Sequence, residues 1–206
     1  MTIKDRDRLD DHYSRKARKE GYPARSVWKL EELNQKYGLF KRGQKVLDLG
    51  CAPGSWSLYA AKAVGSEGLV LGLDLNPPDN HGFPPWVKFE KADIILFSPE
   101  FAENSGPFDA VLSDAAPNTT GHREVDQARS LELANCAWQW AQRLLIKKGF
   151  FLFKVFEGPE LEDLIKNISP SFERLKRLKP KAVRTQSLEI YIIGLGYKCP
   201  FTNVNV

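Results

Sequence analysis

The 206-residue sequence has few of the residues that build disulfide frameworks or metal sites. Its three cysteines and three histidines are scattered, without the close, paired spacing of zinc ligands, so we expect no metal ion. No apolar run reaches about 18 residues, and the opening "MTIKDRDRLDDHY" is charged rather than apolar. The sequence therefore predicts neither a membrane span nor a secretion signal, and we expect a cytoplasmic monomer.

Two common nucleotide-binding motifs are also missing. The stretch "VLDLGCAPGSW", residues 46–56, runs from an apolar segment into a glycine turn, but it matches neither G-x-G-x-x-G nor G-x-x-x-x-G-K-[ST]. Gly50 and Gly54 stand four residues apart, and no Lys-Ser or Lys-Thr follows to hold a phosphate. A dinucleotide oxidoreductase is therefore disfavoured, and a cofactor without a pyrophosphate suits this turn better.

The positive charge is concentrated, although the formal net charge is only +4. Residues 12–29 hold six cations and one acid, and residues 172–184 hold another six cations and one acid. Either run alone is compatible with a solvated surface. Two such runs in one small protein favour a nucleic-acid partner, whose phosphates they would neutralise.

Short apolar runs alternate with helical patterns along the chain. Strands are predicted at residues 45–50, 68–75, 87–92, 108–113, 149–156 and 188–197, and helices at 55–64, 123–149 and 158–168. This alternation predicts an α/β, Rossmann-like fold: an open, mostly parallel sheet with helices on both faces. We expect residues 1–206 to form a single domain with a basic N-terminal arm at about 1–28.

Acidic residues stand where two of the predicted strands end. Asp74 closes the second strand about twenty residues after Gly54, where a carboxylate can accept both hydroxyl groups of an adenosine ribose. Asp93 follows the third strand, in position to accept from an adenine amino group. Together with the glycine turn, this pattern suits S-adenosylmethionine.

Lys154 interrupts "GFFLFKVF", which otherwise resembles a central strand. A buried ammonium group costs several kcal/mol unless it is paired or loses its proton, so the fold must supply partners. Asp114 follows the preceding strand, and Glu189 begins the last one. If the last strand runs antiparallel, all three residues meet at the edge where open α/β sheets bind ligands. The alternative is a purely structural network of buried ion pairs.

Five segments, "RSVWKL", "DLGCAPGSW", "VLSDAAPN", "FKVFEG" and "SLEIY", give the sequence a resemblance to the FtsJ/RrmJ family of ribose 2'-O-methyltransferases over roughly residues 15–197. The resemblance implies a seven-stranded methyltransferase sheet with an antiparallel last strand. It also implies S-adenosylmethionine-dependent methylation of a ribose, on a uridine of large-subunit ribosomal RNA. Two positions depart from the family pattern, namely Ser55, where a glycine is usual, and Leu188, where an arginine is usual.

The resemblance also assigns residues to roles. The implied catalytic tetrad is Lys29, Asp114, Lys154 and Glu189. The cofactor site would comprise Gly50, Pro53, Gly54, Trp56, Asp74, Asp93 and Asp114. Lys154 would be the base or the group that stabilises the alkoxide, with Asp114 orienting it and the other two residues positioning the hydroxyl group. We expect RNA phosphates to contact Arg15, Lys16, Arg18, Lys19 and Arg25.

Two other functions remain open on these motifs. Close relatives methylate the ribose of transfer RNA anticodon loops, and the motifs do not separate them from enzymes of ribosomal RNA. A non-catalytic RNA-binding protein could keep the same fold, but it would have no reason to keep two lysines and two acids at the strand ends.

Overall fold

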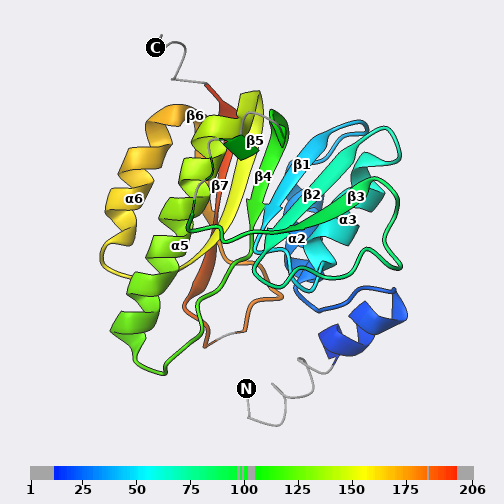
Figure 1. The fold of residues 1–206 in the computed structure, drawn as a ribbon. Helices are drawn as coiled ribbons and strands as arrows, with labels where there is room; N and C mark the ends of the chain where they lie inside the picture. The colour runs from blue at the N-terminus through cyan, green and yellow to red at the C-terminus, as the bar shows by residue number, and fades with distance from the viewer. Residues whose placement is uncertain (1–11, 97, 99, 102–104, 185, 199–206) are drawn as a thin grey trace.

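The computed structural model describes residues 12–96, 98, 100–101, 105–184 and 186–198. Its centre is one seven-stranded sheet in the order β3-β2-β1-β4-β5-β7-β6, with helices on both faces (Figure 1). The strands are β1 (Lys45–Leu49), β2 (Leu69–Asp74), β3 (Val87–Lys91), β4 (Phe108–Ser113), β5 (Leu145–Phe156), β6 (Phe172–Leu178) and β7 (Glu189–Tyr197).

Two helices pack on each face of the sheet. The helices are α2 (Val27–Tyr37), α3 (Ser55–Val64), α5 (Arg123–Leu144) and α6 (Leu161–Ile168), with a helical stretch at residues 12–19 and a 3₁₀ turn at Ser169–Ser171. Successive strand residues point to opposite faces, so Val46 packs with α2 and α3 while Leu47 packs with α5 and α6. None of the helices in the described residues is both long and apolar enough to cross a membrane.

The directions of the strands determine which residues lie at the same end of the sheet. The strands from β3 to β5 are parallel, and β7 is antiparallel to both of its neighbours. In this register Glu189 lies opposite Phe156, and Tyr191 lies opposite Lys154. The mostly parallel sheet with an antiparallel last strand is therefore confirmed, and the start of β7 lies beside the carboxyl end of β5.

The expected elements differ from the observed ones in three places, the first of which is α2 (Val27–Tyr37), a helix that the sequence pattern did not predict. The sequence pattern extended the long helix to residue 149, but α5 ends at Leu144 because Leu145 already pairs with Phe108 in the sheet. The pattern also does not predict β6, whose sequence stands out only as a basic run. As an edge strand, β6 exposes most of its charged side chains and has few apolar positions, so its alternation is weak.

Candidate active site

The four predicted catalytic residues come together at the carboxyl end of the sheet. Lys29 lies in the first turn of α2, Asp114 directly follows β4, Lys154 lies near the end of β5, and Glu189 begins β7. Their side chains retain between 6% and 17% of their accessible surface, so they are largely desolvated but still within reach of a ligand. The antiparallel direction of β7 thus brings Glu189 to the same edge of the sheet as Asp114 and Lys154, as expected.

Two ion pairs join the four side chains. Lys29 Nζ lies 2.5 Å from Glu189 Oε1, and Lys154 Nζ lies 3.1 Å from Asp114 Oδ1. Lys154 also donates a hydrogen bond to the backbone carbonyl of Asp114 at 2.6 Å. This second bond fixes the direction of the amine, because a flexible lysine held at two acceptors loses most of its freedom.

Tyr191 connects the two pairs, and the sequence analysis did not identify it. Its hydroxyl lies 2.7 Å from Asp114 Oδ1 and 2.5 Å from Glu189 Oε1. The phenol has one proton and therefore donates to one carboxylate at a time. The available signal was the spacing: Tyr191 stands two residues after Glu189 in a strand, so both side chains point to the same face.

The charges in this network balance. Burial opposes ionisation of Asp114, but the ammonium groups of Lys154 and Lys29 outweigh it, and the pKa of Asp114 is lowered. Burial, with Asp114 and Glu189 nearby, raises the pKa of Tyr191 well above its ordinary value, so the phenol stays protonated. Two ammonium groups thus face two carboxylates across a neutral hydroxyl.

A cavity of about 630 Å³ opens next to this network. It lies beyond the carboxyl ends of β1, β2, β3 and β4, the usual ligand position in an open α/β sheet. The described residues that line it include Gly50, Ala52, Asp74, Asp93, Asp114 and Glu132, with Arg129 as the one cation. Four acids against one arginine suit a ligand that carries positive charge better than a phosphate.

The glycine turn at the cavity is fastened to the end of β2. The backbone NH groups of Gly50 and Cys51 both bond to the carbonyl of Leu73, and the NH of Ala52 donates to Asp74 Oδ2 at 3.0 Å. Gly50 has a φ of 72°, and a Cβ added there would lie 2.6 Å from the Cβ of Ala115. Only glycine suits this position, which lets two loops close around the cavity.

Three residues expected to contact the cofactor are absent from the described lining: Pro53, Gly54 and Trp56. The Trp56 side chain is buried, donates from its indole NH to the carbonyl of Ser26 and packs near Tyr191. A Cβ on Gly54 would meet the ring of Phe83 at 2.5 Å. Their part in cofactor binding stays a prediction.

The basic residues of the N-terminal run divide into two groups. Arg15, Arg18 and Lys19 are exposed. Lys16, in contrast, lies over the ring of Trp28 at 3.7 Å, and Arg25 Nη2 donates to the carbonyl of Ala182 at 3.3 Å.

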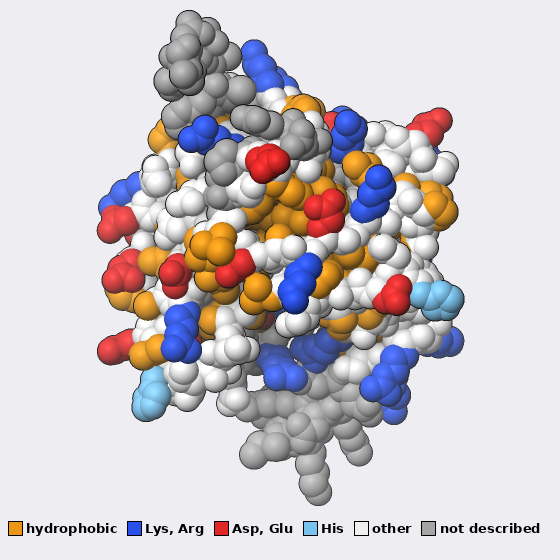
Figure 2. All heavy atoms as spheres, viewed as in Figure 1, with side chains coloured by type: hydrophobic (Ala, Val, Ile, Leu, Met, Phe, Trp, Pro, Cys, Tyr) orange, Lys and Arg blue, Asp and Glu red, His pale blue; other side chains and the backbone are white. Residues whose placement is uncertain are grey.

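Figure 2 shows lysine and arginine side chains gathered at the lower end of the molecule. The bond from Arg25 joins the N-terminal run to the loop between β6 and β7, which carries part of the second basic run. Trp28 is only 3% exposed and donates its indole NH to the carbonyl of Tyr13, so it belongs to the core and is not free to stack on a base.

A family model described as FtsJ-like methyltransferase matches residues 22–197. The chain belongs to this family. It is 47% identical to the ribosomal RNA large subunit methyltransferase E of Oleidesulfovibrio alaskensis over 191 residues, which cover 91% of this chain and 92% of that protein. The protein of the same description from Nitratidesulfovibrio vulgaris strain Miyazaki F is 48% identical, covering 91% and 94%.

Solved structures give the same fold. A ribosomal RNA methyltransferase from Plasmodium falciparum superposes with a TM-score of 0.75 at 25% identity, covering 85% of this chain and 98% of that one. An rRNA-methylase from Clostridium thermocellum, at 17% identity and a TM-score of 0.58, covers 81% and 96% and supports the fold alone.

As a member of this family, the chain departs from the pattern at Ser55 without strain. Ser55 is not among the residues with positive φ, and its hydroxyl accepts a hydrogen bond from the NH of Ala24 at 2.7 Å. The side chain therefore ties the segment before α2 to the start of α3.

The described residues contain no group of three or more His, Cys, Asp or Glu side chains that could hold a metal ion.

Proposed function

We propose that this FtsJ-like methyltransferase transfers a methyl group from S-adenosylmethionine to the 2'-hydroxyl of a ribose, on a uridine of large-subunit ribosomal RNA. The observation that carries the proposal is the meeting of two lysines, two carboxylates and Tyr191 beside an acidic cavity. The ribosomal substrate is supported by the relatives, which are described as ribosomal RNA large subunit methyltransferases. We expect the protein to act as a cytoplasmic monomer.

The cavity fits the proposed cofactor in size and charge. Its volume of about 630 Å³ lies within the range of about 300–1,000 Å³ that is common for small-molecule sites. Asp74 would hold the ribose, since each of its oxygens accepts one backbone NH and retains a lone pair for a hydroxyl group. Asp93 would accept a hydrogen bond from the adenine amino group. Asp114 would lie near the positively charged sulfonium of the cofactor.

When bound, S-adenosylmethionine would supply an electrophilic methyl group for the ribose oxygen. The protein's task is to align the hydroxyl group and to remove its proton. We assign the proton to Lys154, whose ammonium group must first release its own proton to solvent, because a base must lie within hydrogen-bond reach of a poor nucleophile. Asp114 holds that amine in place through its carboxylate and its backbone carbonyl.

Lys29 and Glu189 would position the hydroxyl from the other side. Lys29 and Tyr191 both contact Oε1 of Glu189. Because Tyr191 also contacts Asp114, a movement of the Lys29–Glu189 pair would displace the Lys154–Asp114 pair as well. Orientation alone can supply several kcal/mol of barrier reduction. Loss of either residue should therefore slow the reaction less than loss of Lys154.

RNA is the proposed substrate because DNA has no 2'-hydroxyl. The exposed Arg15, Arg18 and Lys19 would contact phosphates, which fixes the position of the RNA without reading its sequence. Lys16 and Arg25 would contribute charge while they hold the N-terminal segment against the body of the protein.

The test is transfer of a labelled methyl group to large ribosomal subunits and to bulk transfer RNA in parallel, followed by mapping of the modified ribose. Label in the large subunit, on one ribose, is the expected result. Label only in transfer RNA would refute the ribosomal assignment, and label in neither, with the cofactor bound, would favour the non-catalytic alternative.

A further inference from the structure

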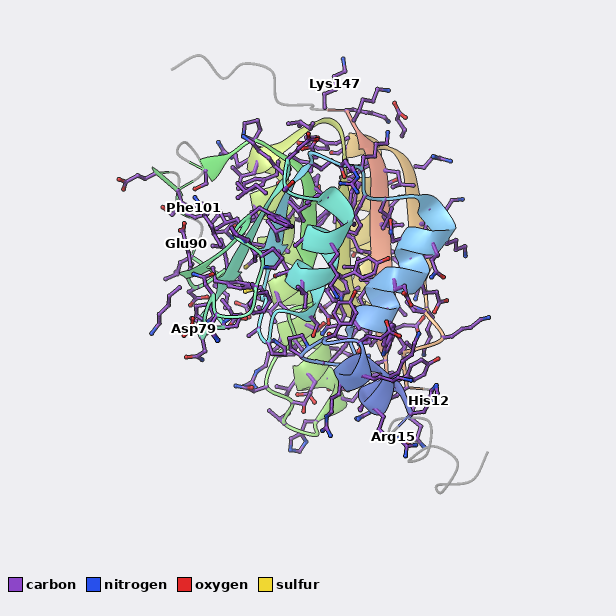
Figure 3. The ribbon with its side chains drawn as sticks, turned by 90° about the vertical axis from the view of Figure 1, so that its right-hand side faces the viewer. His12, Arg15, Asp79, Glu90, Phe101 and Lys147 are labelled. Atoms are coloured by element: carbon purple, nitrogen blue, oxygen red, sulfur yellow. The ribbon has the colours of Figure 1, made fainter. Side chains whose placement is uncertain are left out.

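A second groove lies at the amino end of the sheet, away from the catalytic residues. It has a volume of about 550 Å³ and lies between the end of α2, the loop before β1, the start of β5 and the edge formed by β6 and β7. Figure 3 shows Lys147, at this groove, at the opposite end of the molecule from His12 and Arg15. We call it the amino-edge groove; its charged lining residues are Lys41, Arg42, Lys147, Lys148, Arg174 and Asp109.

The charge of this groove is strongly one-sided. Five cations line it against a single acid, Asp109, whose carboxylate already accepts the backbone NH of Lys45. With Glu173, which pairs with Lys148, counted as a second acid, an excess of three positive charges remains, against a formal net charge of +4 for the whole chain. The groove therefore carries more positive charge than its share of the surface, and an anionic partner would be attracted to it.

Three of the five cations are available for a ligand. Lys148 pairs with Glu173, and Arg174 also lies close enough to that carboxylate to lower its pKa. Lys41, Arg42 and Lys147 are exposed, and within the described part of the chain their side chains form no hydrogen bond or ion pair. Unpaired, hydrated cations of this kind are suited to phosphate contacts.

The backbone also supports a role for the two adjacent lysines. Lys148 has a φ of 69°, and it is the one non-glycine residue with positive φ in the described ranges. This conformation is unfavourable for a side chain such as lysine, and strained residues of this kind gather at functional sites. Lys147 and Lys148 follow each other in the first part of β5, where its register with β4 shifts, and both line the groove.

We propose that the amino-edge groove binds the phosphate backbone of a folded part of the same RNA whose ribose is methylated at the other end of the sheet. The inference rests on the proposed function. Lys147 and Lys154 stand seven residues apart on β5, and the regular stretch from Phe150 to Lys154 alone corresponds to roughly 13 Å at the rise of a strand. A single nucleotide cannot span this distance, whereas a large folded RNA can contact both ends.

The groove would add affinity and orientation without sequence specificity. Each lysine that neutralises a phosphate releases counterions, so its contribution shows as a steeper dependence of affinity on salt. The contact would favour a large, folded ribosomal RNA over a short strand that presents the same nucleotide.

The test compares the double variant Lys41→Gln/Lys147→Gln with a matched control, Lys88→Gln/Lys91→Gln. The control removes the same charge from exposed positions of β3, at the far edge of the sheet. Binding is measured across a salt series to a large-subunit ribosomal RNA transcript and to a single-stranded RNA of about three nucleotides, which at about 3.4 Å per stacked nucleotide covers roughly 10 Å and cannot reach from the active site to the groove. Methyl transfer to large ribosomal subunits is measured in parallel.

For the groove variant we expect transcript binding about tenfold weaker and a salt slope smaller by about two, with unchanged binding of the short strand. The control should behave like the unmodified protein. Equal transcript binding by both variants, or equal losses on the transcript and the short strand, would overturn the groove proposal. Absence of methyl transfer by the unmodified protein would overturn the proposed function instead, and the binding comparison would still decide on the groove.

Discussion

Asp48 offers a sharp test of the electrostatics beneath the active site. It lies in β1, it is 1% exposed, and only one of its carboxylate oxygens has a partner among the described residues, the hydroxyl of Ser57 at 2.5 Å. Burial raises its pKa to about 7; the hydroxyl of Ser57 opposes the rise, and the carboxylates of Asp114 and Asp74 add to it. We predict that Asp48→Asn removes a pH-dependent cost of folding.

The sign follows from proton binding. The folded protein binds the Asp48 proton more tightly than the unfolded chain does, so the stabilisation is complete at low pH and is lost as the pH rises toward 7. Each unit of pKa difference corresponds to about 1.36 kcal/mol, which gives roughly 3 kcal/mol between pH 5 and pH 8. Asparagine does not ionise and keeps an oxygen for Ser57, so the variant should lack this loss.

The assay is urea denaturation of both proteins at pH 5, 6, 7 and 8. The stability of Asp48→Asn relative to the unmodified protein should rise across this series by roughly 3 kcal/mol. Asp163→Asn, which removes a carboxylate from the exposed surface of α6, controls for the loss of one charge. A constant difference between Asp48→Asn and the unmodified protein at all four pH values would refute the reasoning.

Three further predictions test the geometry of the site. Gly50→Ala should lower the free energy of unfolding by about 2–4 kcal/mol, because the residue has a φ of 72° and the new Cβ would meet Ala115; denaturation within about 1 kcal/mol of the original would contradict this. Tyr191→Phe should fold normally but lose about 10- to 100-fold in kcat with little change in KM, since it removes the hydroxyl between two carboxylates. An unchanged kcat would count against that bridge. Lys29→Met should lower kcat less than Lys154→Met does, and the reverse order would exchange the roles that we assign to the two lysines.

The sequence predicted that Lys154, Asp114 and Glu189 meet because a few strong constraints act there, whereas Lys29 was added only by the family resemblance. A lysine inside an apolar strand demands acidic partners, and the antiparallel direction of the last strand brings Glu189 to the same edge as Asp114. Tyr191 was missed because an aromatic residue in an apolar strand is usually a core residue, and its hydroxyl gives no separate signal in the sequence.

Edge strands and the directions of side chains were harder to predict from the sequence. The strand β6 has too few buried apolar residues to alternate visibly, although its pairing with β7 completes the sheet. The direction of Trp56 depends on tertiary packing, since the segment before α2 offers its indole a carbonyl at Ser26. The cavity lining likewise depends on how loops from four strands close together, which a single sequence does not specify.

The most direct test of the central claim is methyl transfer to large ribosomal subunits by Lys154→Met, together with its affinity for S-adenosylmethionine. Lys154 lies outside the cavity lining, so cofactor binding should stay within about threefold of normal while turnover falls to background. Circular dichroism would verify that the variant is folded, because removing one partner of a buried pair is destabilising. Substantial methyl transfer by the folded variant would contradict the account.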